Sequence, residues 1–163
     1  MYTATRVTIL ALALVVASAA AVQAQNNASI NVTAAVQQPI TVTAASPLDF
    51  GTVFPGVPKG IALGSGSAGR FTVTGQASAP VSLSFVVPAN LTFGVSNNLP
   101  ITFTGSWNGI NDPAGSGVAF GVANAATFSV SGNLWVFVGG TVTPSVSQAA
   151  GAYVGTVQMT VTY

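Results

Sequence analysis

Apolar and polar residues alternate along the final stretch of the chain, AYVGTVQMTVTY. Odd positions carry Tyr153, Val157, Met159, Val161 and Tyr163, and even positions carry Thr156, Gln158, Thr160 and Thr162. Because successive side chains of a strand point to opposite faces, this alternation predicts a strand with one apolar face and one Thr-rich face. Such a strand must lie inside a sheet or leave a long exposed edge.

The same two-residue period runs through residues 28–44, where the apolar residues fall on even positions. In the first half these are Ile30, Val32, Ala34 and Val36. The pattern is interrupted at Gln38-Pro39, because proline has no amide hydrogen to donate to a sheet. We therefore expect two strands in tandem, or one bent strand that changes sheets.

Short alternating runs continue along the chain with turn signals such as Asn108-Gly109 and Gly139-Gly140 between them. The runs are 71–74, 81–87, 91–95, 101–104, 118–122, 127–130 and 134–138. Their spacing is typical of sandwiches, and we predict an all-β, immunoglobulin-like antiparallel β-sandwich (Greek key) of about seven to ten strands. Residues 134–138 are apolar at both odd and even positions. This pattern predicts a strand that is covered on both faces, with Trp135 in the core.

The N-terminus has the features of a secretory signal peptide over residues 1–24. Arg6 supplies a positive charge, an apolar run follows, and Val22-Gln23-Ala24 offers a cleavage site. We expect residues 25–163 to form a single domain that is exported to the cell surface or beyond, through the periplasm if the cell is Gram-negative.

Charge is scarce in the chain that would remain after cleavage. It keeps Asp49, Lys59, Arg70 and Asp112 and is formally neutral. This composition excludes electrostatic binding of nucleic acid and a polybasic membrane patch. The chain contains no Cys, so the fold must be held together by its own core.

The residues that common catalytic and metal sites require are also missing. With no His and no Cys in the chain, nucleophile systems based on either residue and histidine or thiolate metal sites cannot form. Asp49 and Asp112 are isolated, and we interpret both as structural turn residues. We expect no enzymatic activity, no catalytic or metal residues and no cofactor. Trp107, beside an Asn-Gly turn, is a candidate contact for a sugar or protein ligand.

The sharpest functional candidate is the segment 26–38. Ile30, Val32, Ala34 and Val36 have the spacing that fills successive pockets of a neighbouring subunit when a strand is added to its sheet. The alternative is that this segment is the first strand of its own sandwich. Both interpretations remain open at this point.

Two stretches carry a resemblance to a known family: LDFGTVFPG at residues 48–56, and residues 134–163, which end in MTVTY. With them the chain resembles a family of secreted bacterial domains of unknown function that share an LDFG motif and a VTVTY ending. That family is similar to fimbrial, pilin-like and spore-coat-type subunits. The resemblance implies an immunoglobulin-like sandwich, a surface or pilus role with assembly by donor-strand exchange, and no catalytic residue.

We therefore expect an exported, non-enzymatic structural or adhesive protein that associates with itself or with other surface subunits through strand addition. A monomeric secreted module that binds carbohydrate or protein near Trp107 is the first alternative. A small outer-membrane β-barrel is the second, because a terminal aromatic preceded by alternating apolar residues is typical of a barrel's last strand.

Overall fold

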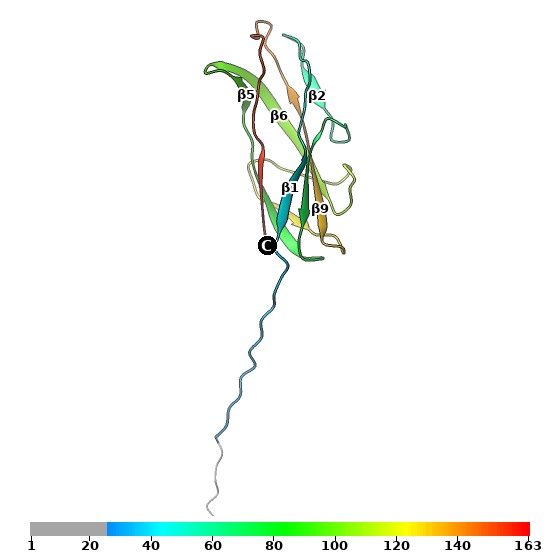
Figure 1. Ribbon diagram of the computed structural model, residues 1–163, viewed down its shortest axis with the longest axis vertical. Coiled ribbons are helices and arrows are strands. Elements are labelled where there is room, and N and C mark those ends of the chain that lie inside the picture. Colours follow the sequence, from blue (N-terminus) through cyan, green and yellow to red (C-terminus); the bar gives the residue numbers. More distant parts are fainter. Residues whose placement is uncertain (1–25) are drawn as a thin grey trace, which may run out of the picture. The chain divides into compact units, whose positions relative to one another are not determined.

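The computed structural model describes residues 26–163, and the predicted signal peptide lies outside this range. The chain divides into two units after Ala35, and each is described by itself. The second unit, Val36–Tyr163, contains ten strands (Figure 1). They are β1 (Thr41–Ser46), β2 (Lys59–Ile61), β3 (Gly69–Thr74), β4 (Pro80–Val86), β5 (Asn90–Phe93), β6 (Asn97–Asn108), β7 (Ser116–Gly117), β8 (Asn124–Thr127), β9 (Asn133–Val142) and β10 (Gln158–Thr162).

The strands form two antiparallel sheets of unequal size. The seven-stranded sheet has the order β1-β3-β9-β6-β5, with β2 also paired to β9 and β7 to β6. The three-stranded sheet has the order β10-β4-β8. Strands that are consecutive in the chain repeatedly lie in different sheets, for example β3 and β4. The predicted antiparallel β-sandwich is confirmed.

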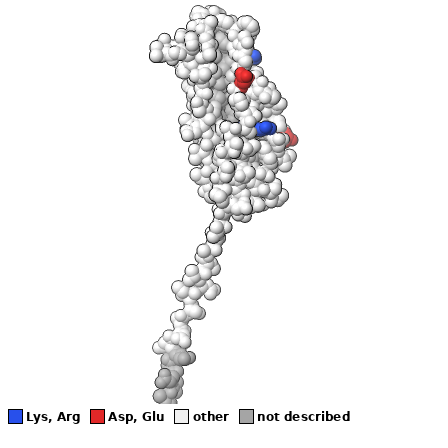
Figure 2. Space-filling view, viewed as in Figure 1, with Lys and Arg blue, Asp and Glu red and all other residues white. Residues whose placement is uncertain are grey.

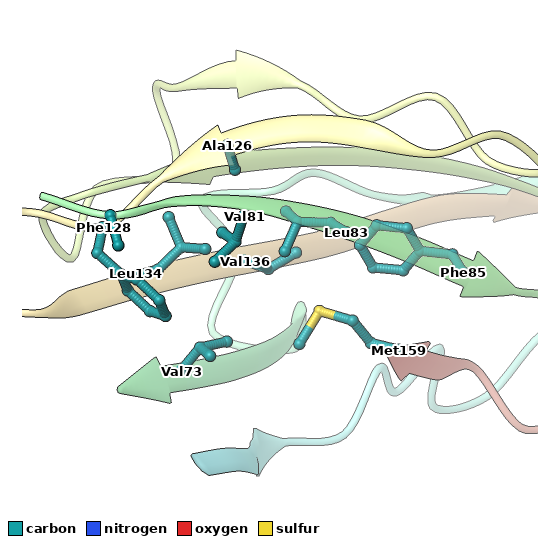
Figure 3. Close-up of a cluster of buried hydrophobic side chains, with 10 residues drawn as sticks. Val73, Val81, Leu83, Phe85, Ala126, Phe128, Leu134, Val136 and Met159 are labelled. Carbon is teal, nitrogen blue, oxygen red and sulfur yellow. The ribbon is translucent and has the colours of Figure 1, made fainter. Parts of the chain in front are cut away.

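One core cluster fills the space between the two sheets. From the small sheet, Val81, Leu83 and Phe85 of β4 alternate with serines and point inward. They meet Val73 of β3 and Leu134 and Val136 of β9 (Figure 3). Leu83, Leu134 and Val136 are fully buried, so this half of the sandwich is closed.

Strand β9 is the central strand of the large sheet, and it continues through Gly139-Gly140, where the sequence predicts a turn. That prediction is wrong. A Cβ on Gly139 would lie 2.4 Å from the carbonyl oxygen of Ile61, and one on Gly140 would lie 2.4 Å from that of Thr102. Neighbouring backbones approach so closely here that only glycine fits.

The final alternating stretch forms a shorter strand than predicted, and the chain changes sheets before it. Val154 makes an isolated bridge to Thr92 of β5 in the large sheet, whereas β10 pairs with β4 in the small sheet. Within β10 the predicted alternation is present, since Met159 is buried while Thr160 is exposed.

Three of the predicted strands are absent, wholly or for the most part, from the described residues. Residues 118–122 contain no strand, and of residues 127–130 only Thr127 belongs to one, at the end of β8. Residues 26–40 have no strand assignment either, so the tandem-strand prediction holds only for its second half, which is β1. No helix within residues 26–163 has the length and apolar character to cross a membrane.

Candidate strand-acceptor groove

An apolar groove runs along the open edge of the sandwich, between β1 and the stretch of chain that leads into β10. Its wide section encloses about 1000 Å³ and lies between residues 44–55 on one side and residues 148–157 on the other. Its narrow section, about 650 Å³, lies between β1 and residues 156–159. The two sections share Ala44, Phe71, Thr156 and Val157, so they form one continuous groove.

The groove exists because the small sheet does not cover the whole of the large one. In the described part of the chain, β1 pairs only with β3 and β10 pairs only with β4. The backbone groups on the other edge of each strand therefore have no partner in a sheet. A strand placed beside β10 would extend the small sheet over the exposed part of the large one.

The floor of the wide section is a second apolar cluster. Phe50, Leu99, Ile101 and Val142 form its buried part. Leu48, Leu91, Phe103 and Tyr153 pack against them and are only partly buried. All eight of these residues also line the groove, so this cluster has a face that opens to solvent.

The wall formed by residues 148–157 is held tightly against β5 and the start of β6. Gln148 donates hydrogen bonds from Nε2 to the carbonyl oxygen of Asn98 (3.1 Å) and to the Tyr153 hydroxyl (2.6 Å). A Cβ on Gly151 would lie 2.3 Å from the Phe93 ring, and one on Gly155 would lie 2.6 Å from Leu91. This wall is therefore packed in place, and the groove is preformed.

The opposite wall contains the LDFG stretch, whose acidic residue has a structural role. The Asp49 carboxylate accepts a hydrogen bond of 2.7 Å from the amide of Gly51, which has a positive φ of 56°. Lys59 donates from Nζ to the carbonyl oxygen of Thr52 (2.9 Å). Asp112 likewise accepts from the amide of Ala114 (2.8 Å). Both aspartates thus stabilise turns, as their sequence context predicts.

The narrow section exposes apolar side chains that a complete sandwich would cover. Val42 of β1 is 40% exposed, and its neighbour on the same face, Ala44, is also exposed. Val86 at the end of β4 is 68% exposed. These side chains line the groove together with Phe71, Val157 and Met159. Sequence reasoning did not find the groove, because alternation indicates an apolar face without indicating whether anything covers it.

The candidate assembly residues of the N-terminal segment are exposed and belong to no strand. Exposure is 86% for Ile30, 88% for Val32 and 95% for Val36, and Ala34 is exposed as well. Their alternation therefore buries nothing in the single copy of the chain.

The point where the N-terminal segment joins the domain is fixed by a small hydrogen-bond cluster, which we call the latch: Gln38, Gln76 and Tyr163. The Tyr163 hydroxyl donates to the carbonyl oxygen of Gln38 and accepts from the amide of Gln76 (2.9 Å). The amide of Gln38 donates to Oε1 of Gln76 (3.4 Å). The Tyr163 ring packs against Phe128, with 6.4 Å between ring centroids. Gln38 is thus held at a defined place.

The two tryptophans lie on opposite faces of the large sheet, and both are half-buried. Trp107 lies opposite Val136 in the β6–β9 register and packs against the core cluster, because directly opposed residues share a face of the sheet. Trp135 lies opposite Asn108 and Thr72 on the other face and is half-buried. Trp107 is only half-buried, so a ligand contact at this residue stays a prediction.

Charge and metal-binding chemistry are sparse around the groove. Figure 2 shows charged atoms along one side of the domain only, and the rest of the face in view is uncharged. The wide section contains one charged residue, Asp49, and the narrow section contains none. Residues 26–163 contain no group of three or more acidic, His or Cys side chains. The groove is suited to an occupant that has apolar side chains and backbone groups free to form hydrogen bonds.

The fold and this groove define a class: an antiparallel β-sandwich with an apolar groove along its open edge. The chain belongs to the family described as a domain of unknown function (DUF4402), whose sequence model matches residues 56–163. The matched region includes β2 to β10 and one wall of the groove, while the LDFG stretch and the N-terminal segment precede it. No curated protein matches the chain.

Proposed function

We propose that this protein is an exported, non-enzymatic structural subunit of the cell surface that assembles by strand addition. In this assembly residues 28–36 of one copy fill the groove of another. One observation carries the proposal. The described part of the chain contains both an apolar groove beside an unpaired strand edge and a segment, residues 28–36, that has the pattern of a strand but pairs with none.

The chemistry of the segment matches that of the groove. A strand presents side chains to one face at every second residue, so Ile30, Val32, Ala34 and Val36 would all point into the groove. Asn31 and Thr33, on the other parity, would face solvent. The unpaired edge of β10 offers backbone hydrogen-bonding groups to the added strand.

Apolar burial supplies the driving force. Fully burying one valine or isoleucine side chain stabilises a complex by about 1.5–3 kcal/mol. Three such side chains are more than four-fifths exposed in the segment, and the groove exposes Val42 and Val86 as well. Because neither the segment nor the narrow section carries a charge, the association should change little with salt concentration.

The resemblance to fimbrial and pilin-like subunits supports the same proposal. Such subunits have immunoglobulin-like sandwiches that are completed by a strand from a neighbour. Two features of this chain are like those of such subunits: its β-sandwich architecture and a groove in which a further strand would fit.

The proposal is tested with a chain that begins at Gln25 and a variant that lacks residues 26–35. The full chain should form oligomers or filaments in sedimentation velocity and electron microscopy. The variant should remain monomeric with an unchanged circular-dichroism spectrum, and it should bind a synthetic peptide of residues 26–38. An unfolded variant would show instead that the segment is a strand of its own sandwich.

Two substituted peptides test which face of the segment is used. The peptide with Ile30→Asp and Val32→Asp should bind at least about 100-fold more weakly, since it loses two buried aliphatic side chains. The control peptide with Asn31→Asp and Thr33→Asp places the same two charges on the solvent face and should bind within about threefold of the parent. Equal loss in both peptides would contradict strand addition.

A further inference from the structure

The domain has two poles, which lie at the two ends of β9 (Figure 1). At the start of β9 is the exit pole, formed by the turns at residues 75–79 and 129–132 with the latch. Gly75 donates to the carbonyl oxygen of Gly132 (3.0 Å), which joins the two turns, and Gln76 belongs to the latch. The N-terminal segment therefore leaves the domain at the exit pole.

At the end of β9 is the mouth pole, formed by Phe54, Val57 and Val146. Gly56 donates to the carbonyl oxygen of Ser145 (3.0 Å), and Val57 donates to that of Phe54 (3.1 Å), so the two loops are held together. The three side chains are exposed, at 66% for Phe54, 56% for Val57 and 89% for Val146. The wide section of the groove opens here, since Phe54, Pro55 and Pro144 line it.

The latch leaves very little chain between the domain and the donated strand. Gln38 is bound to Gln76 and Tyr163, and only Gln37 separates it from Val36. Two residue steps span at most about 7 Å. A copy whose Val36 is inserted in a groove must therefore press its exit pole directly against the domain that it enters.

We propose that the mouth pole is the docking surface for the exit pole of a second copy, so that assembly is head-to-tail and open-ended. This inference rests on the proposed strand addition. Insertion through the mouth pole covers Phe54, Val57 and Val146, and Val130, 88% exposed on the exit pole, is the apolar side chain that meets them. Residues 75–79 and 129–132 carry no charge, which suits an apolar contact.

The direction of the donated strand follows from this docking. Val36 lies at the mouth pole in the wide section, and Ile30 lies farther in, toward the narrow section. The added strand then runs from the exit pole to the mouth pole of the acceptor. Strand β10 runs the opposite way, toward Tyr163, so the added strand is antiparallel to it.

The alternative entry, through the exit pole, predicts a different assembly. Two exit poles would then face each other, each chain could donate to the other, and a closed pair would result. A contact between unlike surfaces that does not close produces an open chain, whereas a contact between like surfaces produces a closed dimer. The two arrangements are therefore distinguishable by which residues cross-link and how many copies join.

Cross-linking tests the docking in the full chain, which contains no cysteine of its own. The variant with both Val57→Cys and Val130→Cys should give a ladder of covalent oligomers with a short bismaleimide. Each single-cysteine variant should remain monomeric on a denaturing gel. Dimers from the Val130→Cys variant alone would establish the closed pair and overturn the proposal, as would filaments in which the double variant fails to cross-link.

A charge on the mouth pole separates this inference from the proposed function. The variant Val146→Asp should raise the concentration needed for assembly at least tenfold and leave peptide binding to the groove within twofold, because Val146 does not line the groove. The control is Val122→Asp, at a residue that is 58% exposed and belongs to neither pole, and it should assemble normally. If Val146→Asp assembles like the parent, the docking is wrong while strand addition stands. If the parent peptide does not bind, strand addition itself fails, and the docking inference falls with it.

Discussion

The sandwich contains two apolar clusters that share the strands β6 and β9 but differ in what covers them. The cluster around Leu83, Leu134 and Val136 lies between both sheets and is closed. The cluster around Phe50, Ile101 and Val142 belongs to the large sheet and its loops, and it borders a groove of about 1000 Å³. The small sheet, with three strands, ends before it reaches this second cluster.

In the assembly that we propose, this difference separates the part of the molecule that stabilises the fold from the part that binds a second copy. The closed cluster has the burial that a domain needs to be stable by itself. The open cluster exposes apolar surface next to unpaired strand edges, which a soluble monomer normally avoids. Our proposal is that this groove receives a strand, and the two-residue apolar pattern of residues 28–36 supports the proposal.

The largest expected effect comes from damaging the closed cluster. Leu83→Ala should lower the free energy of unfolding by roughly 2–5 kcal/mol, because it leaves a cavity at a fully buried position. Urea unfolding followed by circular dichroism measures this loss. The control on the same strand, Val86→Ala at a position that is 68% exposed, should cost less than about 1 kcal/mol. Similar losses in both variants would remove the distinction between a closed and an open region.

Filling the groove should have an intermediate effect of opposite sign. For the variant that lacks residues 26–35, the peptide of residues 26–38 at about 100 times its Kd should raise the free energy of unfolding by about 2.7 kcal/mol. Thermal melts should show a rise of roughly 10 °C for a domain of this size. The peptide with charges at Ile30 and Val32 should leave the melting temperature unchanged. A peptide that binds without stabilising the fold would show that the groove is not its site.

The smallest expected effect comes from placing a side chain of the chain itself in the groove. Ala44 of β1 lines both sections, so Ala44→Leu should raise the free energy of unfolding by less than about 1 kcal/mol and weaken peptide binding about tenfold. Isothermal titration calorimetry measures the affinity. Thr43→Leu adds a leucine on the opposite face of β1 and should leave the affinity unchanged. Equal weakening by both would argue against an occupant between β1 and β10.

The sandwich fold was predictable because a two-residue period is a local property, and most strands of the chain display it. Val81, Leu83 and Phe85 show it in β4, and all three are buried. Gly139-Gly140 misled the prediction, because a glycine pair is typical of turns when it is read locally. In the fold these glycines lie in β9, where neighbouring backbones come too close for a Cβ.

Only one part of the candidate site was predictable from the sequence, namely the segment that we propose is donated. Ile30, Val32, Ala34 and Val36 were identified from their spacing, whereas the groove has lining residues from several distant segments of the chain. Trp107 shows the same limit in another form. Its neighbours in sequence suggest an exposed turn, but its cross-strand partner Val136 places it on the core face.

The sequence by itself determined the β class, the near absence of charge and a segment with apolar residues at every second position, since each follows from residue type and local periodicity. Only the tertiary structure decided that the final stretch changes sheets, that within residues 26–163 β1 and β10 each pair along one edge, and that an apolar groove lies between them. The reason is physical. Alternation specifies which face of a strand is apolar, but whether that face is covered depends on how many strands each sheet contains and on where residues far apart in the chain come together.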